Sequence, residues 1–431
     1  MRETTNSFFK RLPAFAITSA LFLTASLLAQ RNSPTGKQMT DPAKVHSSAI
    51  VIDTHADTPQ RFVDEHWNFT DPLNGGMLNY DSAKKGNLDA QFFSIWVDPG
   101  QYAGNASARR TLELIDGTLE QVHKAPNKLQ LCTTADQIIE AYSRGKFAVL
   151  MGIEGGHSIE DSLGLLRDYY RLGVRYMTLT WSYTNNWADS SGDRDNPAIK
   201  HHDGLTPFGK DVVREMNRLG MLVDISHVSD NTFWDVIGIT RTPIIASHSS
   251  ARALTQAPRN MTDEMLLAMK KNSGVVMVNF HQAFILEKWR LAWNAQKPER
   301  QKAQDALAAE YKAKGLPVPY TASNRIDREF AAKIGRAPFN SLIDHFDHVI
   351  KVAGIDHVGI GTDFDGVGCV PAELSSYDKF PVLTRALLEK GYSAADIKKI
   401  YGGNLLRVMR AVEQRSRELK STPPIESKIS D

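Results

Sequence analysis

Short apolar runs rich in β-branched residues alternate along this chain with amphipathic stretches of helical period. The apolar runs lie at 49–53, 90–97, 147–153, 176–180, 221–225, 243–246, 274–280 and 357–361. Helical periodicity is clearest at 106–123, 163–172, 206–219 and 263–271. Continuous apolar runs of this length indicate strands that are buried on both faces, and the stretches between them indicate covering helices.

Strands and helices that alternate about eight times predict an α/β fold, namely a (β/α)8 barrel of the TIM type. The alternative is an open, doubly wound sheet. Such a sheet commonly carries a glycine-rich phosphate loop after its first strand, and no such loop follows residue 53. The barrel is therefore the favoured interpretation.

One interval breaks the alternation. Residues 282–334, before the last predicted strand, are charged and rich in Ala, Lys and Gln. This composition predicts an inserted helical pair. Such an insertion could act as a lid or as an oligomer contact, for instance in a homodimer. A solvent-exposed surface segment without such a role explains the composition equally well. The chain then resumes its last strand and ends in a helix that starts near Ala394.

The N-terminal residues predict export. Lys10 and Arg11 precede an apolar stretch at 12–28, which Ala29 and Gln30 follow. This pattern is typical of a signal peptide over residues 1–30, with a periplasmic or secreted product. An uncleaved N-terminal membrane anchor is the alternative, because Leu27 is larger than the residue usually found near a cleavage site. We expect a linker at 31–45, the barrel domain at 46–415 and a flexible tail at 416–431.

Composition excludes several other classes. The 431 residues, 42% of them hydrophobic, are enough for one large domain. The formal net charge of +2 does not indicate a nucleic-acid or anionic-membrane partner. Cys132 and Cys369 are the only cysteines, so the chain has neither a disulfide framework nor a thiolate zinc motif. These two residues could still pair in an oxidising compartment.

The first predicted strand delivers two candidate metal ligands, because it ends in the sequence Asp53-Thr54-His55-Ala56-Asp57. Side chains alternate across a strand, so His55 and Asp57 point the same way if the extended geometry persists. An imidazole beside a carboxylate is a pair that suits a divalent metal such as zinc.

Four more candidates end other predicted strands: Glu154, His227, His248 and Asp363. A single strand-end histidine is more often a satisfied polar residue than a metal ligand. Six such residues at the same end of a barrel would, however, meet in one cavity. Three histidines and three carboxylates exceed what one tetrahedral zinc takes, so two metals that share a carboxylate fit the count better.

Several motifs made of these residues occur in an order that resembles the membrane (renal-type) dipeptidases, zinc enzymes of the amidohydrolase-like barrels. The resemblance extends from about Ser47 to Asn404. The motifs are Asp53-Thr54-His55-Ala56-Asp57, Glu154-Gly155-Gly156-His157-Ser158, Asp224-Ile225-Ser226-His227-Val228-Ser229-Asp230, Ser247-His248-Ser249-Ser250 and Gly361-Thr362-Asp363-Phe364-Asp365-Gly366.

The resemblance implies a role for each position. One zinc ion would be held by His55, Asp57 and Glu154, and a second by Glu154, His227 and His248. Glu154 would thus be catalytic as the shared ligand, and Asp363 would be the catalytic acid and base. Arg259 falls where the family binds the C-terminal carboxylate of the substrate. Trp181, at a substrate-binding position, departs from the histidine that the family commonly has there.

These assignments imply an exported, zinc-dependent dipeptidase with two Zn²⁺ ions per chain. Its partner would be a small dipeptide, with a D-residue allowed on the C-terminal side, and neither nucleic acid nor a membrane beyond an N-terminal anchor. Because Trp181 replaces the usual histidine, a binuclear metallohydrolase acting on another amide or a tailored peptide is the alternative. A non-catalytic binding protein that retains the barrel is a third hypothesis, and the complete ligand set argues against it.

Overall fold

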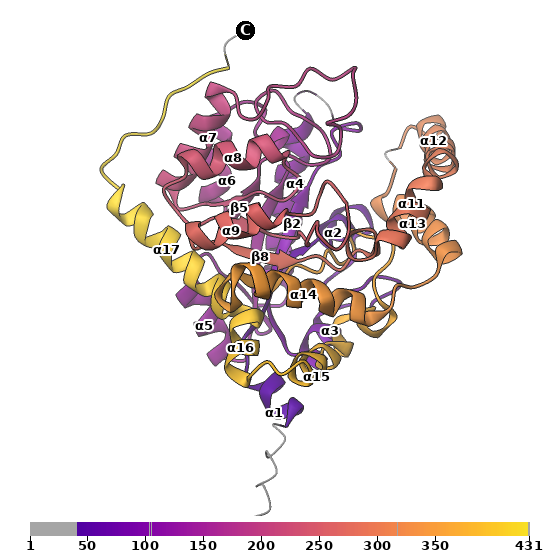
Figure 1. The fold of residues 1–431 in the computed structure, drawn as a ribbon. Coiled ribbons are helices and arrows are strands. Elements are labelled where there is room, and N and C mark those ends of the chain that lie inside the picture. The colour runs from indigo at the N-terminus through magenta and orange to yellow at the C-terminus, as the bar shows by residue number, and fades with distance from the viewer. Residues whose placement is uncertain (1–40, 103, 105, 317, 430–431) are drawn as a thin grey trace, which may run out of the picture. The chain divides into compact units, whose positions relative to one another are not determined.

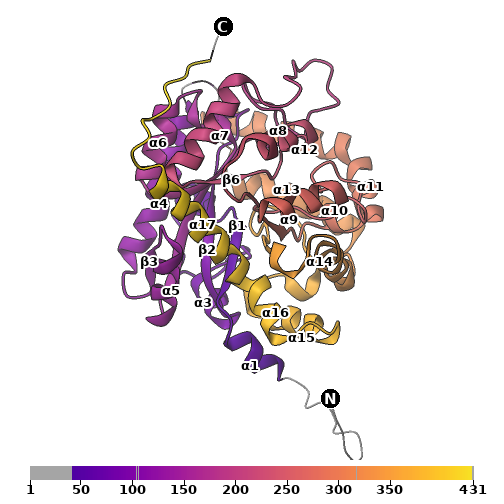
Figure 2. The same cartoon turned by 60° about the vertical axis from the view of Figure 1, so that its left-hand side comes forward.

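The computed structural model describes residues 41–102, 104, 106–316 and 318–429, and the predicted signal peptide lies outside this part of the chain. Strands alternate with helices, and the helices lie outside the strands (Figures 1 and 2). The strands are β1 Val51–Ala56, β2 Leu88–Trp96, β3 Leu129–Leu131, β4 Phe147–Glu154, β5 Val174–Thr178, β6 Leu222–Asp224, β7 Ile245–Ala246, β8 Val275–Val278 and β9 Val358–Ile360. Each apolar run of the sequence contributes one of these strands, and β3 is an addition.

Every described strand pair is parallel, in the order β1-β2-β4-β5-β6-β7-β8-β9, with β3 beside β4. The first and last strands meet after their ends. The Asp57 amide donates to the Phe364 carbonyl over 2.9 Å, and the Asp363 amide donates to the His55 carbonyl over 3.1 Å. The sheet is therefore a nearly closed barrel, and the prediction of a TIM-like (β/α)8 fold is confirmed.

Serine and threonine side chains cap the start of several of the barrel helices. The caps of five helices are Thr134, Ser162, Thr206, Ser229 and Thr262, whose side chains accept hydrogen bonds from backbone N–H groups in the first turn. The helices outside the insertion are α1 Pro42–Ser47, α2 Pro59–Asp64, α3 Tyr80–Lys85, α4 Ala106–Lys124, α5 Ala135–Ser143, α6 Leu163–Arg171, α7 Pro207–Leu219, α8 Asp230–Ile239, α9 Asp263–Asn272, α14 Phe339–Ala353, α15 Pro381–Glu389, α16 Ala394–Lys398 and α17 Asn404–Glu418.

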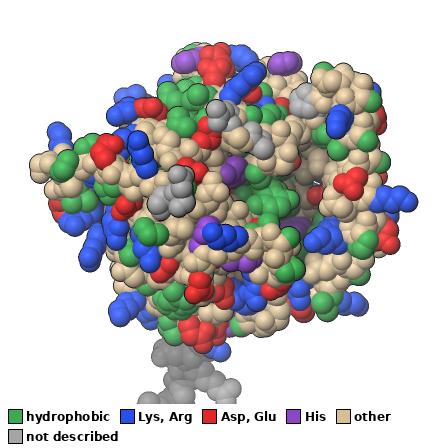
Figure 3. All heavy atoms as spheres, turned by 90° about the horizontal axis from the view of Figure 1, so that it is seen from above, with side chains coloured by type: hydrophobic (Ala, Val, Ile, Leu, Met, Phe, Trp, Pro, Cys, Tyr) green, Lys and Arg blue, Asp and Glu red, His purple; other side chains and the backbone are tan. Residues whose placement is uncertain are grey.

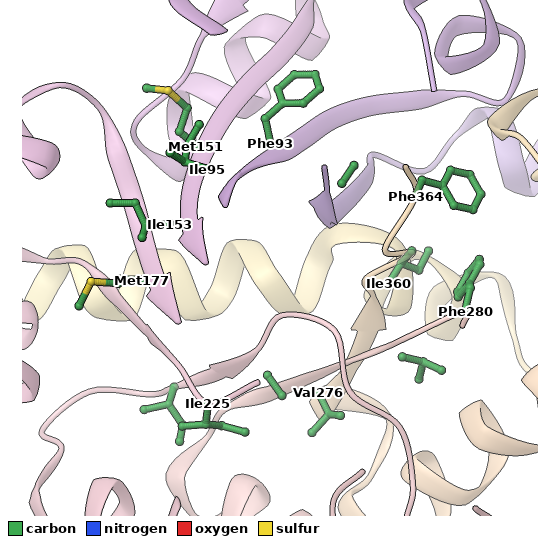
Figure 4. Close-up of a cluster of buried hydrophobic side chains, with 14 of the residues drawn as sticks. Phe93, Ile95, Met151, Ile153, Met177, Ile225, Val276, Phe280, Ile360 and Phe364 are labelled. Atoms are coloured by element: carbon green, nitrogen blue, oxygen red, sulfur yellow. The ribbon is translucent and has the colours of Figure 1, made fainter. Parts of the chain in front are cut away.

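The core has two layers, because alternate residues of a buried strand point to opposite faces. Phe92 and Leu150 belong to one cluster, together with Tyr176, and their neighbours Phe93 and Met151 belong to the other. Figure 4 shows part of the second cluster, which is built from residues of successive strands. Both layers are mainly apolar, and the polar side chains buried within the strands include Asp53 of β1 and Gln91 and Ser94 of β2.

The insertion has the predicted bounds but contains four helices instead of a helical pair. It contains α10 Gln282–Ile285, α11 Glu287–Ala295, α12 Lys297–Ala313 and α13 Tyr320–Ile334. Leu286 is extended and separates the first two helices, and Pro298 lies in the first turn of α12, where a proline is tolerated and marks the start of a helix. The insertion has a small core of its own, in which Trp289 packs with Ala331.

The structure also bears on the two cysteines and on the end of the barrel domain. Cys132 and Cys369 are both buried and free, so they do not pair in this structure. Helix α17 continues to Glu418, past the predicted end of the domain at residue 415. Beyond it, the backbone N–H of Ile425 donates a hydrogen bond to Glu215 over 3.2 Å.

Candidate active site

The ends of β1 and β4 bring the first three candidates together. His55 Nε2 lies 3.3 Å from Glu154 Oε2 and 3.6 Å from Asp57 Oδ2. All three side chains are buried. His55 Nε2 and Asp57 Oδ1 have no hydrogen-bond partner among the described residues. Buried polar atoms are normally paired, so these converging orphan atoms are what a site for a cation would present.

The other oxygen of Glu154 faces the ends of β6 and β7. Glu154 Oε1 lies 2.8 Å from His227 Nε2 and 3.5 Å from His248 Nε2, and the two Nε2 atoms are 3.0 Å apart. The carboxylate thus contacts His55 through Oε2, and His227 and His248 through Oε1. This is the arrangement that a carboxylate shared by two metal ions requires.

Hydrogen bonds at the opposite ring nitrogens orient two of the imidazoles. His55 Nδ1 lies 3.0 Å from the Tyr176 hydroxyl, and His248 Nδ1 lies 2.7 Å from Ser247 Oγ. His227 Nδ1 has a longer contact of 3.5 Å with Ser182 Oγ. A partner at Nδ1 leaves Nε2 as the ligand atom, which is how metal-binding histidines are usually held.

Burial and neighbouring charges shift the pKa values of the side chains in this cluster in different directions. Burial raises the pKa of Glu154 to about 7, although the neighbouring His55 acts to lower it. Burial acts to lower the pKa of His55, yet Tyr176, Glu154 and Asp57 outweigh it and raise this pKa well above its ordinary value. Burial lowers the pKa of His227 and of His248, so both imidazoles are neutral and able to act as ligands.

Two groups of side chains place their ligand atoms within 4.8 Å of one another. They are His55, Glu154 and His248, and His55, Asp57 and Asp363. His227 adjoins the first group through Glu154. The donor set of imidazole nitrogens and carboxylate oxygens fits zinc and other divalent metals of similar preference.

Asp363 lies at the end of β9, in a loop whose geometry is constrained. Its Oδ2 accepts a hydrogen bond of 2.8 Å from the Asn279 amide, and its backbone is left-handed at φ 62°. His227 is also left-handed, at φ 68°. Strain of this kind is retained where the surroundings enforce it, commonly at functional sites. At Gly366 a Cβ atom would lie 2.0 Å from Asp57 Oδ2 and 2.4 Å from Asp363 Oδ1, so glycine makes room for both carboxylates.

Arg259 reaches the same cavity from the loop after β7. Its Nη2 donates to the His248 carbonyl over 3.1 Å and its Nη1 donates to Ser249 Oγ over 3.3 Å. Burial lowers the pKa of Arg259 to about 10, against the opposite effect of the nearby carboxylates, and the group stays cationic at neutral pH. Its Nε has no partner among the described residues, so the guanidinium retains donor capacity for a ligand.

A cavity of about 420 Å³ joins these groups. In the view from above, histidine side chains lie beside a recess near the middle of that face (Figure 3). The volume falls within the range of about 300 to 1,000 Å³ that is usual for small-molecule sites. The cavity is lined by Asp57, Glu154, His227, Arg259 and Asp363, and also by Trp181, whose ring centroid is 6.2 Å from that of His227.

The structure brings all eight predicted site residues to this one region, and it adds others that the sequence pattern did not single out. Tyr176 and Asn279 contact His55 and Asp363 directly, as described above. The insertion contributes Tyr320, Ser323, Asn324, Asp327 and Arg300 to the cavity wall. Asn279 does end a strand run, so the strand-end rule applies to it, whereas nothing local marks Tyr320.

Comparison with known sequences agrees with this geometry. The membrane dipeptidase family, peptidase family M19, matches residues 39–423 of the chain. Dipeptidase 3 from Mus musculus and Dipeptidase 3 from Homo sapiens are each 32% identical to this chain, over 391 and 384 residues. Each alignment covers 88% of this chain and 68% of the relative.

Solved structures give the same result for the fold. The probable dipeptidase PvdM from Pseudomonas aeruginosa superposes with a TM-score of 0.71 at 26% identity, covering 87% of this chain and 98% of that one. A metallo peptidase from Rhodobacter sphaeroides superposes with a TM-score of 0.68 at 24% identity, covering 84% and 99%. Because the family match extends over nearly all of the barrel, the chain belongs to the membrane dipeptidase family, peptidase family M19, and is a metallo-dipeptidase that hydrolyses peptide bonds.

Proposed function

We propose that this chain is an exported dipeptidase that uses two zinc ions to hydrolyse free dipeptides. The observation that carries the proposal is that the two carboxylate oxygens of Glu154 face different histidines. Oε2 faces His55, and Oε1 faces His227 and His248. One zinc ion would be held by His55, Asp57 and Glu154, and the other by Glu154, His227 and His248. Zinc ions held there would lower the pKa of water and polarise the scissile carbonyl.

Asp363 is the proposed acid and base. The Asn279 amide binds its Oδ2, which fixes the carboxyl group in the cavity and leaves Oδ1 beside Gly366. A carboxylate held there can accept a proton from the attacking water and return it to the departing amine. Arg259, with donors directed into the same cavity, would bind the C-terminal carboxylate of the substrate. These two groups select a peptide that ends one residue after the cut.

Trp181 favours a second candidate function. It lies in the cavity wall near His227, where an indole can donate one hydrogen bond but cannot accept one or ionise. A binuclear hydrolase acting on another amide or on a tailored peptide would use the same metals and acid. The D-residue on the C-terminal side is part of the first proposal, and the structure of the Rhodobacter sphaeroides metallo peptidase carries a phosphinate mimic of L-Ala-D-Ala.

Metal content tests the shared carboxylate. We expect fully loaded wild-type protein to hold about two zinc ions per chain by elemental analysis. Asp57→Asn, which changes a ligand of one site, should hold about one, and Glu154→Gln should lose most of both. A wild type that binds no more than one ion would contradict the binuclear assignment.

A substrate panel tests the reaction. The zinc-loaded protein should hydrolyse L-Ala-L-Ala and L-Ala-D-Ala, and it should leave tripeptides and N-acyl amino acids intact. If an N-acyl amino acid or another amide is cleaved faster than every dipeptide, the second candidate function replaces the first.

Export is the part of the proposal that depends on the sequence of residues 1–30 alone. None of the helices in the described part of the chain combines the length and the apolar character that a membrane span needs. We expect the mature protein to begin near Gln30, as measured by mass spectrometry of protein from the native host. Recovery of the intact N-terminus in a membrane fraction would support the anchor instead.

A further inference from the structure

A second cavity, of about 920 Å³, adjoins the 420 Å³ cavity of the candidate active site, which we call the inner cavity. The two cavities share four lining residues, Trp96, Trp181, Tyr320 and Ser323. None of the predicted metal ligands lines the second cavity, which we call the outer cavity. Its far side is formed by residues of the inserted helix α12 and the segment after it, among them Gln304, Ala308, Lys312 and Leu316.

Aromatic rings form the boundary between the two cavities. The Trp96 and Trp181 rings meet edge to face with their centroids 4.8 Å apart. Tyr320 packs against Trp96 at 5.5 Å, and Tyr183 packs against Trp181 at 5.5 Å. Trp96 belongs to the inward face of β2, because Ser94, two residues earlier, hydrogen-bonds Glu154. The wall thus begins beside the metal cluster and continues outward.

Arg259 determines which end of a substrate faces this wall. Arg259 lines the inner cavity only, while Trp96 and Trp181 line both. If the C-terminal carboxylate binds Arg259 and the scissile bond lies at the metal cluster, the N-terminal residue extends toward the aromatic wall. The inner cavity, at about 420 Å³, is the smaller of the two, so a large N-terminal side chain has its space in the outer cavity.

We propose that the outer cavity is the subsite for the N-terminal side chain of the substrate, and that it selects a large planar aromatic group. This inference rests on the proposed dipeptidase function and gives the insertion a role, because α12 supplies part of the subsite. The structure supports an uncharged aromatic occupant in two ways, through the rings of the wall and through the balance of charge around it.

The rings offer faces and edges for stacking, which aromatic groups prefer. Trp96 Nε1 is also buried without a hydrogen-bond partner among the described residues, so it can donate to a ligand. The charges of the lining nearly cancel, since Asp64 pairs with Arg110 at 2.7 Å, and Lys312 against Asp98 and Asp305 leaves a single net negative charge. No charge of one sign dominates the cavity, as recognition of an ionic side chain would require.

The test compares Trp-Ala with Ala-Ala as substrates of the zinc-loaded, full-length enzyme. Wild type should prefer Trp-Ala by about tenfold in kcat/KM, with the difference mainly in KM. Ala308→Trp places an indole in the outer cavity and should lower the ratio of the two kcat/KM values by about tenfold. Ala309→Trp, the matched control on the same helix, replaces an exposed residue that does not line the cavity, and it should leave the ratio unchanged.

Both variants replace exposed alanines of α12, so equal melting temperatures would verify that each is folded. The inference is overturned if wild type shows no preference for Trp-Ala, or if Ala308→Trp affects both substrates equally. Failure of the dipeptidase proposal gives a different result, namely that neither Trp-Ala nor Ala-Ala is hydrolysed by enzyme of verified zinc content.

Discussion

Replacing Arg259 tests how the substrate is oriented. The guanidinium is held by the His248 carbonyl and Ser249 Oγ, and its carbon atom lies 5.3 Å from the centre of the Phe284 ring. These contacts fix the plane of the group and leave Nε without a partner among the described residues. A planar, fixed fork of N–H donors matches a carboxylate through two parallel hydrogen bonds. A neutral C-terminal amide cannot accept in the same way.

The size of the effect follows from charge pairing in a largely buried site. Truncating one partner of such a pair costs about 2 to 4 kcal/mol, which includes the charge left unpaired. This corresponds to a fall of about 30- to 900-fold in kcat/KM for Arg259→Ala. Arg259→Lys should recover little, because an ammonium group has no fork and would have to reach the same point from a different stem.

The assay is the ratio of kcat/KM for Ala-Ala to that for its C-terminal amide. Wild type should show a large ratio, and Arg259→Ala should bring it near one with zinc content unchanged. Arg252→Lys is the matched control, because Arg252 lies in the same loop but binds Asp230 through two contacts of 2.7 Å. Equal hydrolysis of the dipeptide and its amide by wild type would refute the carboxylate clamp.

Three further substitutions probe other parts of the molecule. Trp181→His should leave zinc content unchanged and raise kcat/KM on simple dipeptides by about tenfold if one transition-state hydrogen bond is regained, and a fall on every dipeptide would refute this. Burial, with Asp57 and Asp363, raises the pKa of Tyr320 well above its ordinary value, so its phenol stays protonated and can donate a hydrogen bond. Tyr320→Phe should therefore lower kcat/KM by about tenfold at every assay pH without changing zinc content. Burial raises the pKa of Asp89 from 3.8 to about 6, which penalises the folded state above pH 6 and no longer does so below about pH 4. Asp89→Asn should therefore be more stable than wild type at pH 7 by up to about 3 kcal/mol, and urea unfolding should show this advantage shrinking as the pH falls to 5.

The barrel was predictable because its strands are buried on both faces, which gives continuous apolar runs that period and length can identify. Strand β3 was not predicted, because Leu129–Leu131 has only three residues, of which only Leu129 is buried. The insertion was located, but its division into four helices was not predicted. Only three of those helices exceed four residues, and α12 has no buried residue, so periodicity there carries little information about packing.

The site was predictable to the extent that barrel topology sends strand ends to one place. That rule predicted that His55, Glu154 and His248 would meet, and the structure places their ligand atoms within 4.8 Å of one another. It could not predict Tyr320, which comes from a loop-to-helix junction and reaches the cavity only because α13 packs against the barrel mouth. Tyr176 was missed for a different reason, since an aromatic residue within a strand is indistinguishable from core until its hydroxyl partner is seen.

The contacts that orient the imidazoles suggest why Trp181, at a position where the resemblance implies a histidine, leaves the predicted metal ligands in place. The hydroxyl that orients His55 belongs to Tyr176 of β5, and the one that orients His248 belongs to Ser247, directly after β7. The loop that carries Trp181 contacts one imidazole, that of His227, through the 3.5 Å contact of Ser182, and its Ser190 and Ser191 hydroxyls donate to the His227 backbone carbonyl over 3.2 and 3.0 Å. The imidazoles of His55 and His248 are therefore oriented from β5 and from the end of β7, while the loop after β5 lines both cavities through Trp181. A change at position 181 can then alter which substrate binds while the barrel keeps the ligand geometry, which is why zinc content and selectivity should respond independently in Trp181→His.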